Sequence, residues 1–327
     1  MAYIIDLQKL WHDRSQLNEN ADQITKSVAL DPRSRLVSVV VIANGDENQL
    51  LHTLQSVFDQ VFILEVIVVN REGFPEIDSI IEEFANHSPR CSSVTVKRNI
   101  GLAEAYNVGA QYASGQYLLL LEGSCRLPNN AVLKLISTGI RKTAPWVIGT
   151  AEGADDSPLK VLSRLTNFYS QDLHFQQKLP EVSAVGGGIH VPCIGGECIF
   201  IPSRTFMELR GLDKKCFDVN FHRDLCLRVH LAGGDVYQLV NVKIREKIPH
   251  PPSRLSQIFH HEWRSFLAWC HFYRKYVDKR SNRFSVGIFY GFFALSSLGK
   301  SLLRGFSFLL KKLTKSSVGS ADERRFT

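Results

Sequence analysis

The sequence lacks any internal repeat of about 20 to 50 residues, which excludes solenoid and propeller architectures. Its 12 prolines and 22 glycines are spread along 327 residues, so collagen-like and low-complexity chains are excluded as well. Hydrophobic residues make up 44% of the chain and charged residues 22%, a composition typical of globular proteins. The length suffices for one large α/β domain with an appendage, or for two small domains.

The sequence also lacks a CxxC pair, and its first ten residues do not have the pattern expected of a secretory leader. Asp6 and Lys9 interrupt the apolar residues at the start of the chain, so no signal peptide is expected and the predicted location is cytoplasmic. In that compartment we interpret the cysteines as reduced structural thiols. They are seven, an odd number: Cys91, Cys125, Cys193, Cys198, Cys216, Cys226 and Cys270.

Acidic residues are scarce near the end of the chain. Residues 251–327 contain 14 Lys and Arg but only 4 Asp and Glu, whereas the first 250 residues contain 25 basic and 28 acidic groups. The basic character therefore belongs to the tail. Its charges alternate with Phe, Leu, Ile and Gly and match no nucleic-acid-binding module, so an anionic membrane surface is the expected partner and nucleic acid is not.

Three strongly apolar, β-branched or leucine-rich runs predict buried strands at residues 36–42, 64–69 and 117–121. Helices are predicted between them at 47–60, 75–87 and 102–113, and a short strand at 93–97. Residues 1–35 are interpreted as an extension with an amphipathic helix near 4–11. This alternation predicts a mostly parallel sheet with helices on both faces and with ligands at the carboxyl ends of the strands.

The loops that follow these strands contain neither GxGxxG nor GxxxxGK[ST]. A dinucleotide site of the Rossmann type and a P-loop are therefore both disfavoured. The sheet is of a nucleotide-binding kind without either standard phosphate loop.

Eight segments, in this order and spacing, resemble the inverting family-2 glycosyltransferases of the GT-A fold, above all their rhamnosyltransferase-like branch. They are residues 37–42, 54–60, 65–70, 98–109, 113–122, 195–202, 210–213 and 224–228. The resemblance implies a GT-A domain over residues 36–250, with residues 251–327 as a helical C-terminal region. It also implies transfer of rhamnose or another hexose from a nucleoside diphosphate to a lipid-linked or surface polysaccharide.

The resemblance further implies that a sugar nucleotide lies across the strand ends. The residues expected to bind this donor are Ala43, Asn44, Asp46, Asn70, Asn99, Gly101, Asn107, Glu122 and Ser124. In the family, an Asp-x-Asp pair near the diphosphate holds Mg²⁺ or Mn²⁺, because the leaving diphosphate needs its charge neutralised. A later Glu-Asp pair supplies the base that deprotonates the acceptor.

The sequence departs from the family pattern at these acidic positions. Glu122-Gly123-Ser124 keeps one carboxylate of the metal motif, which predicts weak binding of Mg²⁺ or Mn²⁺ through Glu122. Phe221-His222 stands where the Glu-Asp pair is expected, and Asn70 replaces the usual aspartate of the second strand. We therefore assign catalysis to His222, as general base, together with Asp224.

Two interpretations remain open for the whole chain. It is either a divergent transferase or an inactive homologue that binds a nucleotide sugar, a glycan or a partner glycosyltransferase. The site residues have structural alternatives too: Asn70 as a strand terminator, Ser124 as a turn residue, His222 as an exposed loop imidazole and Asp224 as a carboxylate at a helix N-terminus.

The tail contains 16 consecutive uncharged residues at 284–299, followed by apolar sequence with interspersed cations to residue 315. A bilayer-spanning helix needs about 20 residues, so this run is short for a span and suits an interfacial segment. We expect peripheral attachment to the inner face of the membrane. The alternative is a hydrophobic hairpin that packs on the catalytic domain or on a second subunit. The adjacent His260 and His261 do not have the spacing of zinc ligands.

Overall fold

A computed structural model describes residues 36–43, 46–71, 75–96, 100–140, 145–152, 188–191, 193–246 and 255–276. The predicted helix near residues 4–11 and the apolar run at 284–299 lie outside these ranges. The described parts of Met1–Asp213 and Phe221–Lys247 form one compact unit, and those of Lys214–Asn220 and Ile248–Thr327 form a second.

The first half of the first unit alternates strands and helices as the sequence predicts. In order they are β1 (Val37–Ala43), α3 (Glu47–Phe58), β2 (Ile63–Asn70), α4 (Pro75–His87), β3 (Cys91–Thr95), α5 (Leu102–Gln111) and β4 (Tyr117–Glu122). All seven residues of β1 are buried, because a strand in the middle of a helix-covered sheet is packed on both faces.

The second half of this unit is more irregular. It contains β5 (Cys125–Arg126), α6 (Ala131–Gly139), β6 (Trp146–Glu152), β7 (Gly188–His190), β8 (Cys198–Pro202), α8 (Ser203–Glu208), α9 (Phe221–Leu231) and β9 (Asp235–Glu246). Within the described residues, the strands form one sheet in the order β3-β2-β1-β4-β8-β6-β9-β5, and β7 pairs with β9.

The sheet is parallel from β3 to β4 and mixed beyond β4. The strands β2 and β4 pair with β1 in parallel, and β3 pairs with β2 in the same way. In contrast, β8 runs antiparallel to both β4 and β6. The predicted parallel order thus covers the four strands that end at the candidate donor loops.

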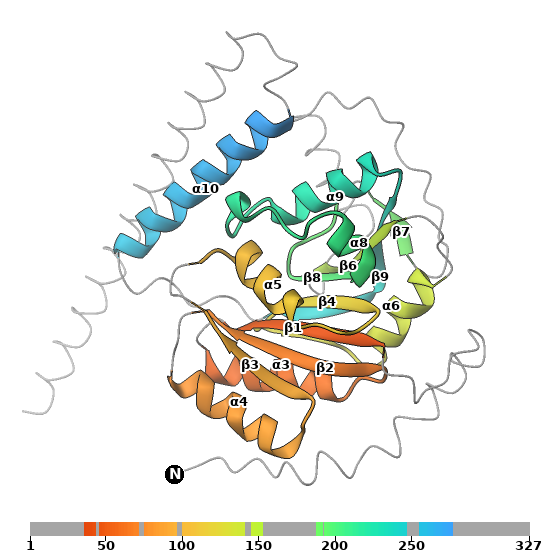
Figure 1. The fold of residues 1–327 in the computed structure, drawn as a ribbon, viewed down its shortest axis with the longest axis vertical. Helices are drawn as coiled ribbons and strands as arrows, with labels where there is room; N and C mark the ends of the chain where they lie inside the picture. The colour runs from red at the N-terminus through yellow and green to blue at the C-terminus, as the bar shows by residue number, and fades with distance from the viewer. Residues whose placement is uncertain are drawn as a thin grey trace, which may run out of the picture. The chain divides into compact units, whose positions relative to one another are not determined.

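The two faces of the sheet carry different layers. The main hydrophobic core lies on the face covered by α3, α4 and α6, and it includes Val39, Val41, Leu119 and Leu121. The other face carries α5, which Figure 1 shows on the opposite side of the sheet from α3 and α4. Since side chains alternate along a strand, the even-numbered residues of β4, including Glu122, point toward the α5 face.

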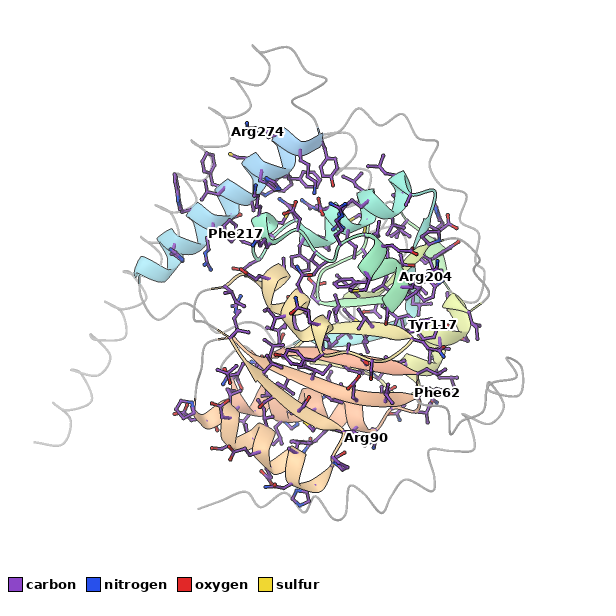
Figure 2. All side chains as sticks on the ribbon, in the orientation of Figure 1. Phe62, Arg90, Tyr117, Arg204, Phe217 and Arg274 are labelled. Atoms are coloured by element: carbon purple, nitrogen blue, oxygen red, sulfur yellow. The ribbon has the colours of Figure 1, made fainter. Side chains whose placement is uncertain are left out.

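Close packing holds α5 on this second face. A Cβ atom at Gly109 would lie 2.3 Å from Cγ1 of Val40 and 2.9 Å from Cγ2 of Val69, so only glycine lets the helix approach so near. On the core face, the ring of Tyr117, labelled in Figure 2, stacks 5.8 Å from Trp146 and 5.3 Å from Phe200.

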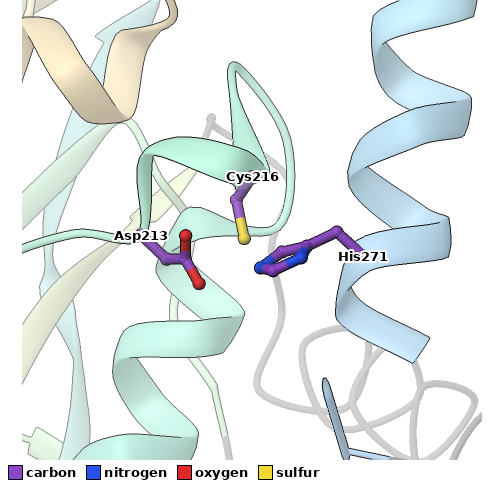
Figure 3. A group of neighbouring side chains, drawn as sticks. All are labelled: Asp213, Cys216 and His271. Carbon is purple, nitrogen blue, oxygen red and sulfur yellow. The ribbon is translucent and has the colours of Figure 1, made fainter. Parts of the chain in front are cut away.

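The second unit contains a short 3₁₀ helix, η2 (Lys214–Cys216), and the helix α10 (Leu255–Tyr276), which contact each other. The guanidinium of Arg264 on α10 lies 5.4 Å from the ring centre of Phe217. Figure 3 shows the Cys216 thiol and the His271 imidazole, both of this unit, pointing toward one another. Among the described helices, none combines the length and the apolar character that crossing a membrane requires.

Candidate active site

The ends of three parallel strands lie side by side at the edge of the sheet where the sequence predicts donor binding. Ala43 of β1 is in register with Asn70 of β2, and Ile42 of β1 is in register with Glu122 of β4. Asn44 and Asn99, two of the predicted donor residues, lie outside the described residues.

The predicted donor residues on the first two strands make contacts within the fold. Asn70 is 1% exposed, and its Nδ2 donates to Oδ1 of Asp78 on α4 at 2.7 Å. Asp46 is the N-cap of α3, where its carboxylate accepts from the backbone N–H and from the side-chain amide of Gln49. Asn70 therefore points toward α4, on the opposite face of the sheet from Glu122.

Two further predicted donor residues belong to α5. Gly101 directly precedes the helix and is buried. Asn107 donates from Nδ2 to the carbonyl of Leu212 at 2.7 Å and accepts the Leu212 backbone N–H at 2.8 Å. The amide nitrogen and the amide oxygen of Asn107 thus both bind the backbone of Leu212. These two hydrogen bonds hold α5 against the segment that follows α8.

Glu122 ends β4 and is partly buried on the α5 face of the sheet. The next residue, Gly123, donates its backbone N–H to the Ile42 carbonyl at 2.8 Å, so the chain turns tightly over the end of β1. A Cβ atom at Gly123 would lie 2.6 Å from the same carbonyl oxygen, which explains the glycine. Ser124, the predicted second metal-motif residue, is 8% exposed.

A second carboxylate that the sequence analysis did not select lies across from Glu122. The register of β4 and β8 pairs Leu121 with Cys198, and the Glu122 backbone N–H donates to the Glu197 carbonyl at 3.0 Å. Glu197 directly precedes β8 and is partly buried, like Glu122. The signal in the sequence was the strand 198–202 after two glycines, but its partner strand could not be deduced from the sequence.

Tyr106 of α5 lies close to this carboxylate pair. Its side chain is fully buried, and among the described residues its hydroxyl has no hydrogen-bond partner. Burial raises the pKa of the phenol well above its usual value, and the charge of Glu122 and smaller effects of Cys125, Cys198 and then Glu197 add to this shift. A buried hydroxyl without a partner is uncommon in proteins, so this one calls for an explanation.

His222 lies in the first turn of α9 and not in an exposed loop. Its ring is 5.4 Å from that of Phe221, which in turn lies 6.0 Å from the ring of Tyr106. A Cβ atom at Gly196 would come within 3.0 Å of Nδ1 of His222, so the Gly195-Gly196 backbone passes against the imidazole. Tyr106, Glu197 and His222 are therefore linked through direct neighbours on one side of the sheet.

The environment of His222 keeps its imidazole neutral. Burial, helped by the positive charge of Arg223, lowers the pKa of His222 to about 3. Within the described part of the chain, Nδ1 is buried without a hydrogen-bond partner. At neutral pH the ring is therefore an uncharged group with an unused polar atom.

Asp224 has a different environment. Its side chain is 0% exposed, and Oδ2 accepts a hydrogen bond from Nε of Arg228 at 2.7 Å, one helical turn further along α9. Arg228 also donates to the carbonyl of Leu209. This geometry favours a bracing role for Asp224 over direct contact with a substrate.

Comparisons with known proteins agree with this fold. Residues 38–188 match the model of glycosyl transferase family 2. Mannosyltransferase PcManGT from Pyrobaculum calidifontis, solved in complex with GDP-Man and Mn²⁺, superposes with a TM-score of 0.55 at 14% identity, covering 96% of this chain and 90% of that one. GalNAc-T7, solved with UDP, GalNAc and Mn²⁺, gives a TM-score of 0.50 at 17% identity, covering 66% of this chain and 44% of that one.

This chain has the GT-A glycosyltransferase fold. Among curated proteins, it is 24% identical over 221 residues to the inactive polypeptide N-acetylgalactosaminyltransferase-like protein 5 of Macaca fascicularis, covering 61% of this chain and 48% of the relative. The chain thus spans about half the length of that relative.

The fold indicates which edge of the sheet binds ligands. In open α/β sheets, ligands bind outside the carboxyl ends of the strands, where Glu122 lies in this chain. In a GT-A sheet, the start of an antiparallel strand next to β4 reaches the same edge, which is how Glu197 joins Glu122 there.

Proposed function

We propose that this chain is an inverting glycosyltransferase that moves a hexose from a nucleoside diphosphate to a hydroxyl group of a glycan. The observation that carries the proposal is the position of Glu122, Glu197 and His222, which are linked through close neighbours at the ligand-binding edge of a GT-A sheet. The match of residues 38–188 to family 2 supports the same reaction class.

The proposed reaction exchanges one bond at the anomeric carbon. The acceptor oxygen attacks this carbon from the face opposite the diphosphate, the new C–O bond forms, and the bond to the diphosphate oxygen breaks. The electron pair of that bond leaves with the diphosphate. The acceptor proton passes to an imidazole nitrogen of His222, which is neutral and able to receive it.

A pKa of about 3 makes His222 a weak base in the free protein. Binding of a nucleoside diphosphate would place negative charge beside the imidazole, and negative charge favours the protonated ring. We therefore propose that donor binding itself raises the pKa of His222 toward the value that proton transfer needs. Asp224 would act by holding α9 through Arg228 and not by touching the sugar.

The donor and the acceptor are proposed from chemistry that related proteins share. The two similar solved structures contain UDP and GDP-mannose, which supports a nucleoside-diphosphate sugar as donor. We propose rhamnose or another hexose as the transferred sugar and a lipid-linked or surface polysaccharide as acceptor. The basic, apolar sequence at 284–315 supports peripheral attachment to the anionic inner face of a membrane, where such acceptors are held.

A second candidate is an inactive homologue that binds a nucleotide sugar, a glycan or a partner glycosyltransferase without turnover. Two observations favour it. Phe221 and His222 stand where the sequence resemblance places the acidic pair used for catalysis, and the matched relative from Macaca fascicularis is named as inactive. Both candidates use the same donor site, so they differ in turnover and not in binding.

Donor binding and turnover separate the two candidates. We would titrate the full chain with UDP-, GDP- and dTDP-sugars in a calorimeter, with Mn²⁺ present, and then assay sugar transfer. The transferase proposal expects turnover that His222→Asn lowers by about 100-fold or more, while donor affinity stays within a few-fold. The exposed His52 of α3, changed to Asn, is the matched control and should leave both values unchanged.

The pH profile adds a second readout. Because the free protein has a pKa of about 3 at His222, kcat/KM should keep its value as the pH falls from 7 to 5, whereas kcat should decline at a higher pH in the donor complex. Donor binding without transfer under all these conditions would reject the enzyme and support the inactive homologue.

A further inference from the structure

Glu122 and Glu197 are direct neighbours across the β4–β8 ladder. They extend the register that pairs Leu121 with Cys198, and the hydrogen bond from Glu122 N–H to the Glu197 carbonyl is 3.0 Å long. Residues directly opposite in an antiparallel pair share one face of the sheet, with Cβ atoms about 4.5 to 5.5 Å apart. The two carboxylates therefore leave the strands side by side on the α5 face.

Two carboxylates that face each other across a ladder repel one another, and partial burial of both residues strengthens this repulsion. A divalent cation bound between them would offset it. Carboxylate oxygens are the ligands that Mg²⁺ and Mn²⁺ prefer, and Mg²⁺ is commonly held by one or two carboxylates together with substrate phosphates.

The Tyr106 hydroxyl is an independent sign of a ligand at this place. Its ring comes from α5, the helix that covers the same face, and its side chain is 0% exposed. Among the described residues the hydroxyl has no partner, although both carboxylates are near enough to influence it. A buried hydroxyl left without a partner is destabilising, and a bound cation with its water would relieve this cost.

We propose that Glu122 and Glu197 together hold a divalent cation, Mg²⁺ or Mn²⁺, with the Tyr106 hydroxyl lining the same site. The second carboxylate comes from the neighbouring strand, whereas the family motif takes it from the position occupied here by Ser124. The inference deepens the transfer function proposed above, because a cation at this edge would neutralise the donor diphosphate. The cation site itself requires no turnover.

Direct cation binding tests the site. The free Mn²⁺ signal in electron paramagnetic resonance falls when the ion binds, so the full chain can be titrated without any nucleotide. We expect one site in the wild type and a loss of affinity of about tenfold or more in both Glu122→Gln and Glu197→Gln. Glu208→Gln, which removes one exposed carboxylate from α8, is the control and should bind as the wild type does.

Thermal unfolding gives a second readout. With Mn²⁺, Tm should rise in the wild type and in Glu208→Gln but not in Glu197→Gln. Tyr106→Phe should weaken Mn²⁺ binding, and unchanged binding in this variant would remove the hydroxyl from the site.

The following outcomes support or overturn the proposed cation site. Wild-type protein that binds no Mn²⁺, or Glu197→Gln protein that binds it as tightly as the wild type, overturns the two-carboxylate site. If Glu197→Gln does not fold, Glu197→Asp keeps the charge with a shorter reach and should bind more weakly than the wild type. Carboxylate-dependent Mn²⁺ binding without sugar transfer would support the site and reject the transfer function. Sugar transfer that persists in the presence of chelator and in Glu197→Gln would support the transfer function and reject the two-carboxylate site.

Discussion

Asp224, which the sequence analysis assigned to catalysis, forms a buried ion pair with Arg228. The aspartate side chain has no exposure to solvent, and the arginine side chain is only 17% exposed. Removing one partner of such a pair leaves the other buried and uncompensated, which costs about 3 to 5 kcal/mol. The contribution of Asp224 to stability therefore follows from its burial and its pairing with Arg228.

We predict that Asp224→Asn lowers the free energy of unfolding by about 3 kcal/mol, because the Arg228 guanidinium loses its counter-charge. Urea denaturation measures the change. The matched control is Glu208→Gln, which breaks the Arg204–Glu208 pair, also four residues apart on a helix but exposed, and should leave stability unchanged. Wild-type stability of Asp224→Asn combined with lost sugar transfer would instead return Asp224 to the catalytic group.

Sequence reasoning predicted that polar side chains gather at one edge of the sheet, but it did not predict the contacts that each of them makes. Asn70, Asp46 and Asn107 were predicted to bind the donor, and the structure shows their polar atoms bonded within the chain. Short amides and carboxylates serve turns and caps as readily as ligands. The residue type alone therefore cannot separate the two uses, whereas a hydrogen-bond partner can.

At the scale of elements, the approach of α5 to the sheet depends on a single glycine. The Cβ of an alanine at position 109 would overlap the Val40 and Val69 side chains, both fully buried and unable to move aside. Overpacking costs about 1 to 3 kcal/mol, while the gain in helix propensity returns about 1 kcal/mol.

We therefore predict that Gly109→Ala lowers the free energy of unfolding by about 1 kcal/mol, the middle of the net range, as measured by chemical denaturation. The exposed Gln111 of the same helix, changed to Ala, should alter it far less. Since α5 carries Tyr106, the displaced helix should also weaken Mn²⁺ binding. A Gly109→Ala variant as stable as the wild type would mean that α5 has room to move on β1 and β2.

Local hydrophobic patterns predict individual strands and helices, but they do not predict which distant strands pair. Continuous β-branched and leucine runs predicted β1, β2 and β4, and helical spacing predicted the helices between them. The antiparallel pairing of β4 with β8 joins residues about 80 positions apart. No local pattern encodes such a register, so the partner of Glu122 was missed although each strand has a recognisable sequence.

For the whole molecule, the uneven distribution of charge predicts where the chain meets other surfaces. The tail beyond residue 250 has an excess of basic residues, while the rest of the chain is close to neutral. Each Lys or Arg near an anionic bilayer contributes about 1 kcal/mol of attraction, and the uncharged run at 284–299 adds apolar area for the interface.

We predict that the full chain floats with vesicles that contain anionic lipid and that deletion of residues 284–315 abolishes flotation. Lys311→Gln with Lys312→Gln should reduce binding and its salt dependence, because the attraction is electrostatic. Arg204→Gln with Arg210→Gln removes two exposed charges from the first unit and should leave flotation unchanged. If the deleted chain floats as well as the full one, the tail is not the anchor. A fall in Tm or in subunit number on deletion would then assign the segment to packing on its own domain or on a second copy.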